Sequence, residues 1–272
     1  MEIRAFSEQI LSSPKLEDKL RPPAGELTDA HPGPVWRPEF PARTSDLTMA
    51  AGRAAPAMPS PGALSEPIKR GRAHHIMANH ELQAVEVMAW VLCAFPTAAG
   101  EFRRGLVHII QDEQRHTRMH IERARSLGVE FGEFAVNGYI WKQTARYDRL
   151  EDYLAGLPLT FEGRNLDHTI EFERYFAGAG DPKSAAIMRA IHRDEIEHVR
   201  FGIEWLRRLI PAGQSDWDAY VNHLHWPLHP AKAVGDDFQR ESRLAAGLTP
   251  EFLDRLQQSA ANHDPSSPRP GV

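Results

Sequence analysis

The sequence contains almost no cysteine. Its single thiol, Cys93, excludes an internal disulfide. It also excludes a rubredoxin-like iron site and any cluster that several thiolates hold. If the protein performs redox chemistry, we therefore expect its electrons to come from an external donor.

Long apolar runs are also missing. The opening residues, MEIRAFSEQI, include charged side chains and no apolar run, so they do not predict a secretory signal. The longest apolar stretch, VEVMAWVLCAF, contains Glu86 and is too short to span a bilayer. These absences predict a cytoplasmic protein with no membrane segment.

The chain has no excess of positive charge. Its formal net charge is −5 and its pI is about 6.3, so it exerts no overall attraction on nucleic acid. Short basic pairs such as Arg103-Arg104 are more often solvated helix faces than binding patches. We therefore do not expect a nucleic-acid partner.

Proline separates the N-terminal part of the chain from the rest. Eleven of the 21 prolines lie in the first 67 residues, where they prevent long helices. The sequence predicts an N-terminal arm over residues 1–66 with a short helix near Phe6–Leu20. We expect Trp36 and Phe40 to fix this arm to a core.

Long helical segments follow the arm. They are predicted over Pro67–Phe95, Thr97–Gly128, Tyr139–Ala155, a segment reaching Phe176 beyond a break at Gly156 and Pro158, and a last one that starts at Pro182 and ends before Pro211. The pattern predicts an all-α protein with a four-helix bundle over residues 67–210. A C-terminal helical extension over 211–262 and a disordered tail over 263–272 complete the prediction.

A longer motif occurs twice on these helices. Asp112-Glu113-x-x-His116-x-Arg118 repeats as Asp194-Glu195-x-x-His198-x-Arg200, and Ile-Glu follows each copy at the same offset. Composition alone produces an occasional Glu-x-x-His but not this longer match, which indicates an internal duplication. Glu and His three residues apart share one face of a helix.

Each copy has a glutamate at nearly the same distance upstream. Glu81 lies 32 residues before Glu113, and Glu162 lies 33 residues before Glu195. Glu86 and Glu171 are the competing candidates, but helical rotation turns them about 140° and 180° away from the preferred pair. The alternative explanation is that these helices are unrelated and carry exposed charges.

Four carboxylates in an apolar bundle would balance two divalent cations. The predicted metal ligands are Glu81, Glu113, His116, Glu162, Glu195 and His198. Oxygen and imidazole ligands favour two iron ions, with manganese as the alternative metal.

Further polar residues adjoin the predicted ligands. We expect Asp112 and Asp194 to orient the imidazole rings, unless they are ordinary surface acids. His120 and His192 continue the ligand faces and are assigned to the surroundings of the site, because a core or surface role is commoner than ligation. The histidines at 223, 225 and 229 could form a second metal site, but histidines two apart do not share a helix face and the prolines indicate a loop, so this site is disfavoured. His74, His75 and His80 are weaker candidates still for metal ligands.

The duplicated pattern resembles the carboxylate-bridged di-iron oxygenases, whose signature is an acidic residue and, about thirty positions later, Asp-Glu-x-Arg-His, all of it twice. Residues 112–116 fit this signature, whereas the second copy has Glu197 in place of its Arg. The segments HELQAVEVMAW, DEQRH, DEIEHVRFGIEWL and ESRLAAGLTPEFLDRL resemble the ferritin-like family called domain of unknown function 455. This resemblance implies a ferritin-like fold and a metal site.

The leading functional hypothesis is a di-iron oxygenase or oxidase that uses O₂ to hydroxylate, desaturate or N-oxygenate a small organic substrate. Alternatives are an iron-handling or peroxide-scavenging ferritin-like protein, a tRNA-modifying hydroxylase and a metal-free interaction module. The substrate, the electron donor and a homodimeric state stay open. Whether the arm or the segment 223–230 covers the site also stays open.

Overall fold

The computed structural model describes residues 1–50 and 54–262. Within these ranges the chain forms helices joined by turns and contains no β-strand. The all-α class predicted from the sequence is therefore confirmed. No helix in the described ranges combines the length and apolar content needed to cross a membrane. The tail predicted over 263–272 lies outside the described residues.

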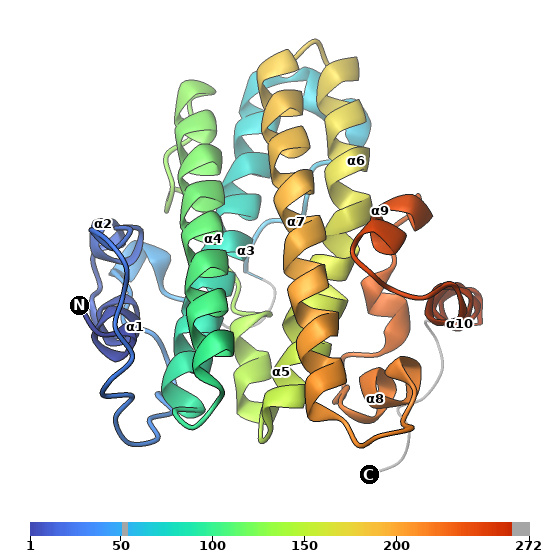
Figure 1. Ribbon diagram of the computed structural model, residues 1–272. Helices are drawn as coiled ribbons and strands as arrows, with labels where there is room; N and C mark the ends of the chain where they lie inside the picture. The colour runs from blue at the N-terminus through green and yellow to red at the C-terminus, as the bar shows by residue number, and fades with distance from the viewer. Residues whose placement is uncertain (51–53, 263–272) are drawn as a thin grey trace. The chain divides into compact units, whose positions relative to one another are not determined.

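The α-helices follow one another from the N-terminal arm to the C-terminal segment (Figure 1). They are α1 (Ile3–Ser12), α2 (Leu16–Lys19), α3 (Pro67–Ala94), α4 (Gly100–Ser126), α5 (Leu150–Gly156), α6 (Gly163–Gly178), α7 (Pro182–Leu209), α8 (Asp216–Asn222), α9 (Arg240–Ala245) and α10 (Pro250–Ala261). Short 3-10 helices occupy Ser45–Leu47, Pro61–Ser65, Trp141–Arg146 and Pro230–Ala233.

The described residues divide into two compact units. The first contains Met1–Leu150 and Phe172–Ile191, and the second contains Glu151–Glu171 and the chain from His192 onward. Helices α6 and α7 therefore contribute residues to both units.

The first unit is built around α3 and α4, which pack along each other and are flanked by the arm (Figure 1). Helix α3 begins with Pro67 at its first position, where the missing N–H has no intrahelical partner to lose. Helix α4 begins at Gly100, so the predicted cap at Thr97 was wrong. It ends before Gly128, whose φ of +84° lets Val129 N bond back to Ala124 O.

In the N-terminal arm, α1 and α2 take the place of the single short helix predicted near Phe6–Leu20. The Trp36 backbone N–H donates to Cys93 O (3.0 Å), and Trp141 Nε1 donates to Glu39 O (3.0 Å). Phe40 is 61% exposed, so the prediction that its ring fixes the arm was wrong. Hydrogen bonds made by backbone atoms of the arm, one of them with the Trp141 side chain, fix this part of the arm instead.

A buried carboxylate on α3 also holds the arm. Glu86 forms one ion pair with Lys19 Nζ (3.0 Å) and a second with Arg43 Nη2 (2.7 Å). All three side chains are almost fully buried. Arg103 similarly pairs with Asp29 (2.8 Å). Charges on the arm thus meet opposite charges on α3 and α4, which is how buried charges are tolerated.

The second unit contains a π-helical segment, Leu157–Glu162, between α5 and α6. The chain stays helical here, so the break predicted at Gly156 and Pro158 was wrong. Pro158 lacks an N–H and disturbs the regular α-helical bonding. Thr160 Oγ1 compensates by donating to Ala155 O (2.8 Å). The helix predicted over Tyr139–Ala155 was also wrong in its first half, which is a turn and a 3-10 helix followed by a bend.

Gly202 lets α7 approach the π-helical segment closely. A Cβ atom at this position would overlap Cβ of Pro158 and would lie 3.5 Å from Cδ2 of Leu159. The close approach therefore requires the absence of a side chain at Gly202. It positions the backbone that leads to Glu162.

The C-terminal segment of the second unit is held by a buried ion pair. Arg243 and Asp167 form two contacts, of 2.5 Å and 2.9 Å, with both side chains fully buried. Arg243 also donates to Gly163 O and Ala233 O, while Asp167 accepts from the backbone of Gly235. The predicted C-terminal helices are present as α8, α9 and α10.

Substituting Gly202 tests this close packing. We expect Gly202→Ala to lower the free energy of unfolding by about 1–3 kcal/mol, because the new methyl group overpacks the contact with Pro158. Urea unfolding measures the change. Gly178→Ala is the matched control, since a Cβ there meets no atom within 4 Å. A Gly202→Ala protein as stable as this control would contradict the packing argument.

Substituting Glu86 tests the charged contact with the arm. Glu86→Gln leaves Lys19 and Arg43 buried without their carboxylate, so we expect a loss of about 3–5 kcal/mol in urea unfolding. Glu8→Gln removes the exposed contact with Arg4 (Glu8 side chain 46% exposed) and serves as the control. Its expected effect is below about 1 kcal/mol. Equal effects would show that Glu86 does not hold the arm.

Candidate metal centre

Three predicted ligands meet in the first unit. Glu81 from α3 and Glu113 and His116 from α4 each offer a ligand atom within 4.8 Å of the other two. All three side chains are buried. We call this set the first half-site.

Helical spacing explains how the sequence assembles the first half-site. Glu113 and His116 are three residues apart on α4, and Nδ1 of His116 lies 3.7 Å from Oε2 of Glu113. Apolar residues at helical spacing surround the ligands and are buried with them: Met77, Ala84, Val85 and Met88 on α3, and Leu106, Ile109 and Ile110 on α4. Each helix therefore buries a face that carries both apolar and ligand residues.

The other three predicted ligands lie in the second unit. Glu162 and His198 offer ligand atoms within 4.8 Å of each other, and Nδ1 of His198 lies 3.9 Å from Oε2 of Glu195. Asn165 Nδ2 donates to Oε1 of Glu195 (3.1 Å) and orients this carboxylate. We call Glu162, Glu195 and His198 the second half-site.

The donor atoms of both half-sites fit iron or manganese. Carboxylate oxygens and imidazole nitrogens suit these ions, and thiolates, which select Cu(I), zinc or iron–sulfur clusters, take no part. The single thiol, Cys93, is buried, and burial raises its pKa to about 12. Glu162 ends the π-helical segment, and such segments often occur at functional sites.

The competing glutamates have other partners in the structure. Glu86 binds Lys19 and Arg43 as described above. Glu171 accepts a hydrogen bond from the backbone N–H of Asp237 (2.9 Å). Both carboxylates therefore hold neighbouring segments of the fold in place.

The predicted orienting acids differ in what they contact. Asp112 is partly exposed and pairs with Arg115 at 2.5 Å, one turn along α4. Arg115 is the arginine of the first Asp-Glu-x-Arg-His copy, so the structure gives this position a surface ion pair. Asp194 is half-buried. The role predicted for these acids toward the imidazole rings stays a prediction.

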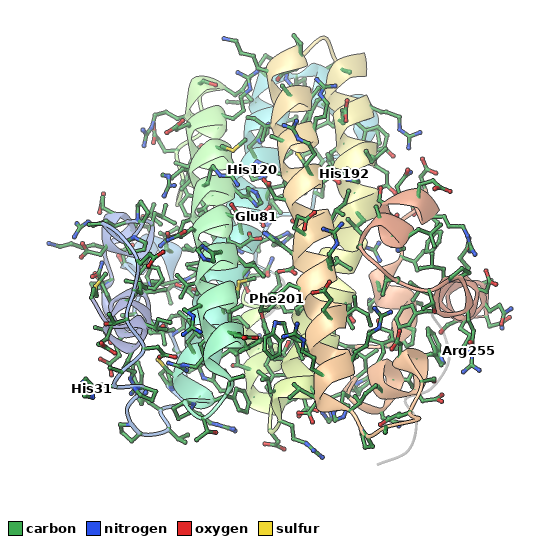
Figure 2. All side chains as sticks on the ribbon, viewed as in Figure 1. His31, Glu81, His120, His192, Phe201 and Arg255 are labelled. Atoms are coloured by element: carbon green, nitrogen blue, oxygen red, sulfur yellow. The ribbon has the colours of Figure 1, made fainter. Side chains whose placement is uncertain are left out.

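His120 and His192 have different surroundings. Nε2 of His120 lies 3.7 Å from Oε1 of Glu81, and Figure 2 shows these two side chains near each other. His192 uses both ring nitrogens in other contacts, Nδ1 with Thr169 Oγ1 (2.7 Å) and Nε2 with Ser242 Oγ (3.0 Å). His120 therefore adjoins the first half-site, whereas His192 ties α7 to α6 and α9.

A hydrogen-bonded chain behind His120 was missed from the sequence. Nδ1 of His120 contacts Nδ1 of His74 (2.8 Å), and Nε2 of His74 contacts Ser184 Oγ (2.8 Å). Ser184 Oγ in turn contacts Oδ2 of Asp181 (2.8 Å). His74 is seven residues before Glu81, so it shares a helix face with this ligand, and that spacing was the available signal.

Burial keeps both imidazoles of this chain neutral. It lowers the pKa of His74 to about 3, with a further decrease from Arg123. It also lowers the pKa of His120 well below its usual value, and His74 and His116 add to this shift. Burial acts to raise the pKa of Asp181, but hydrogen bonds from Arg123 and Ser184 outweigh it and the pKa is lowered.

The proline-flanked histidines have a structural contact. Nδ1 of His223 lies 2.8 Å and Nε2 of His225 lies 3.1 Å from Oδ1 of Asp152, which is buried at the start of α5. This contact ties the end of α8 and the following turn to α5. His229 stacks on Trp226.

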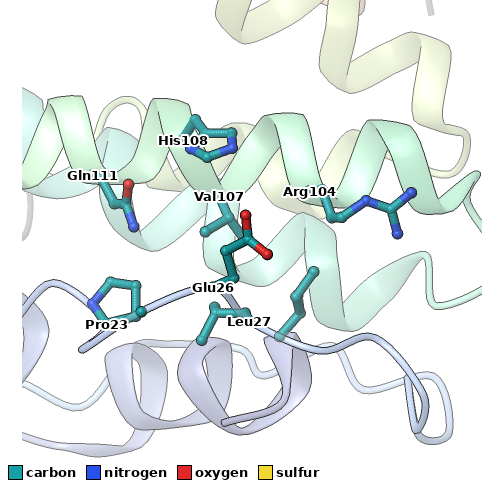
Figure 3. A pocket seen from close by; sticks show the side chains of 9 residues that line it. Pro23, Glu26, Leu27, Arg104, Val107, His108 and Gln111 are labelled. Atoms are coloured by element: carbon teal, nitrogen blue, oxygen red, sulfur yellow. The ribbon is translucent and has the colours of Figure 1, made fainter.

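A surface cleft of about 500 Å³ separates the arm from α4 (Figure 3). Arg104, His108 and Gln111 line it from α4, and Glu26 faces them from the arm. These positions on α4 are three or four residues apart and form one face. At 100° per residue, Gln111 lies about 160° away from Glu113, so the cleft opens on the face of α4 turned away from the first half-site.

The neutral state of His74 predicts a pH dependence. The unfolded ring has its ordinary pKa of 6.5 and the native ring a pKa of about 3, so only the unfolded chain takes up a proton between these values. The free energy of unfolding therefore has its full value, as far as this ring is concerned, above about pH 6.5. It decreases as the pH falls, by about 2 kcal/mol at pH 5. Urea unfolding of chelator-treated protein between pH 7.5 and 5 should show a weaker pH dependence for His74→Phe. Parallel curves for the two proteins would contradict the assignment.

Comparison with known proteins identifies the family of this chain, and the descriptions of the matching proteins name no activity. The family described as "Protein of unknown function (DUF455)" matches residues 7–254. An uncharacterized protein of Haemophilus influenzae is 26% identical over 195 residues, which cover 68% of this chain and 66% of that protein, just under two thirds of its length. No solved structure matches the chain. With nearly its whole length matched, the chain belongs to the DUF455 family of proteins of unknown function.

Proposed function

We propose that this protein is a non-haem di-iron oxidoreductase that uses O₂ to oxidise a small organic substrate. The observation that carries the proposal is that each of the two units buries one copy of a duplicated set of two glutamates and one histidine. A duplicated ligand set is how bundle proteins of the ferritin-like type bind two metal ions. A ferritin-like four-helix bundle is accordingly part of the proposal.

Charge balance supports two ions. The two half-sites together contain four carboxylates, and two divalent cations would neutralise them. Four buried carboxylates concentrate negative charge in a medium of low dielectric constant, where a bound cation stabilises the ionised form. In this proposal two bound metal ions would stabilise the buried glutamates of the two half-sites.

In this proposal the protein residues bind and orient, and the bound iron pair supplies the electron transfer to O₂ and the oxidation of substrate. Asn165 fixes one carboxylate oxygen of Glu195. Buried side chains such as Met77, Met88 and Ile110 would exclude water from the ligands. The ligands need not act as acids or bases themselves.

The proposal also carries the expectations for cofactor and partners. It requires O₂, a small-molecule substrate and an external electron donor, because the one thiol cannot hold a redox cluster. Manganese remains the alternative to iron. The cytoplasmic location and the homodimer remain predictions.

Metal analysis of natively purified protein, combined with O₂ consumption by the reduced protein, tests the proposal. We expect about two iron ions per chain and O₂ consumption that depends on an added reductant. Protein without metal would support a metal-free interaction module. Two irons with peroxide consumption, and no O₂-dependent oxidation across a panel of small organic substrates, would support the scavenging alternative.

The two half-sites should act as one centre. If ligands bridge the ions, Glu113→Ala and Glu195→Ala should each reduce the content of both metals, from about two per chain to well below one. Inductively coupled plasma mass spectrometry of the purified variants measures this content. Glu122→Ala, an exposed substitution in the repeated Ile-Glu pair, is the control. Retention of one full-occupancy metal in each variant would indicate two separate mononuclear sites.

A further inference from the structure

His120 is a buried side chain beside the first half-site. Its ring is fully buried, and Nε2 lies 3.7 Å from Oε1 of Glu81. Nε2 makes no hydrogen bond to any residue in the described ranges. A buried polar atom without a hydrogen bond requires an explanation, such as an ion that the structure does not contain.

The chain of contacts behind His120 begins at a carboxylate that can only accept. Asp181 accepts hydrogen bonds from Arg123 Nη2 (2.6 Å) and from the backbone N–H of Ser184 (3.0 Å). Ser184 Oγ is 2.8 Å from Oδ2 of the same carboxylate. An ionised carboxylate has no proton to give, so the Ser184 hydroxyl donates its one proton to Asp181.

The donor direction of Ser184 then fixes the tautomer of His74. With its proton used, Ser184 Oγ can only accept, and it accepts from Arg123 Nε (2.9 Å) and from Nε2–H of His74 (2.8 Å). A neutral imidazole has one N–H, so Nδ1 of His74 is a bare acceptor. The ring is also stacked on Phe176, with centroids 4.9 Å apart, which holds its plane.

His74 fixes the tautomer of His120 in the same way. The two Nδ1 atoms are 2.8 Å apart, and because the one on His74 is bare, His120 donates Nδ1–H. The second nitrogen of neutral His120, Nε2, therefore carries a lone pair and no proton. This lone pair faces an oxygen of Glu81.

We infer that His120 is a metal ligand through Nε2, joining Glu81, Glu113 and His116. A lone pair and a carboxylate oxygen repel each other unless a cation lies between them. Two ligand atoms about 2.1 Å from one ion lie roughly 3.0–3.7 Å apart. The separation of His120 from Glu81, 3.7 Å, equals that of His116 from Glu113. This inference rests on the metal binding of the proposed function.

The extra ligand makes the two half-sites unequal. The repeat offset of 82 residues aligns His120 with Gly202, which has no side chain and is needed for packing against Pro158. The first half-site would thus provide two imidazoles and the second half-site one. The two bound ions would then differ in affinity and in their absorption spectra.

Titration of chelator-treated, full-length protein with Co²⁺, followed by visible absorption, tests this inference without requiring activity. We expect two Co²⁺ ions per wild-type chain. In His120→Gln, we expect one of the two ions to bind about 10–100-fold more weakly and its absorption band to change. His74→Phe keeps His120 but removes the acceptor for Nδ1–H, so we expect a smaller weakening of the same ion.

His75→Gln is the matched control, because His75 is a buried neighbour of His74 whose Nε2 accepts from the backbone of Gly132. We expect it to leave both Co²⁺ affinities unchanged. A folded His120→Gln protein with wild-type affinities and spectrum would overturn the inference and leave the proposed function intact. If His120→Gln does not fold, unchanged Co²⁺ binding by His74→Phe overturns it instead. A wild-type protein that binds no divalent metal would overturn both.

Discussion

Helices of this structure carry carboxylate side chains that are buried in the core, and the rest of the structure depends on how these charges are compensated. Where the chain supplies its own cations, each buried acid joins segments that are distant in sequence. Glu86 joins α3 to Lys19 and Arg43 of the arm, and Asp167 joins α6 to Arg243 near the C-terminus. An arm rich in proline cannot form long helices that pack against the core. These ion pairs and a few backbone hydrogen bonds attach it to the core instead.

The half-site carboxylates lie close to imidazoles. Near neutral pH the ring of His120 is neutral, because burial lowers its pKa well below the usual value. A neutral ring offers a lone pair to a cation but no charge to a carboxylate. The difference between Glu86, which meets Lys19 and Arg43, and Glu81, which faces His120, is therefore the difference between a carboxylate that holds the fold and one that we propose binds metal.

The repeat is visible in the predicted ligands and the residues next to them in sequence, but not in the contacts that these helices make. Asp112-Glu113-x-x-His116 and Asp194-Glu195-x-x-His198 occupy corresponding positions on α4 and α7. Around them, the first copy has the chain from His120 to Asp181, whereas the second has Gly202 against the π-helical segment. The two copies of the motif therefore have different neighbours, although their predicted ligand residues correspond.

The sequence by itself determined the all-α class, the repeat and the residues that lie together on each helix, because helical periodicity is a local property. It placed Glu113 and His116 on one face and separated Glu81 from Glu86. Only the tertiary structure showed that Glu86 holds the arm, that the chain stays helical through Pro158, and that His120 meets His74 and Ser184. His74 lies 46 residues from His120 and 110 from Ser184. Contacts over such separations depend on how helices pack, and no local pattern encodes which polar groups packing brings together.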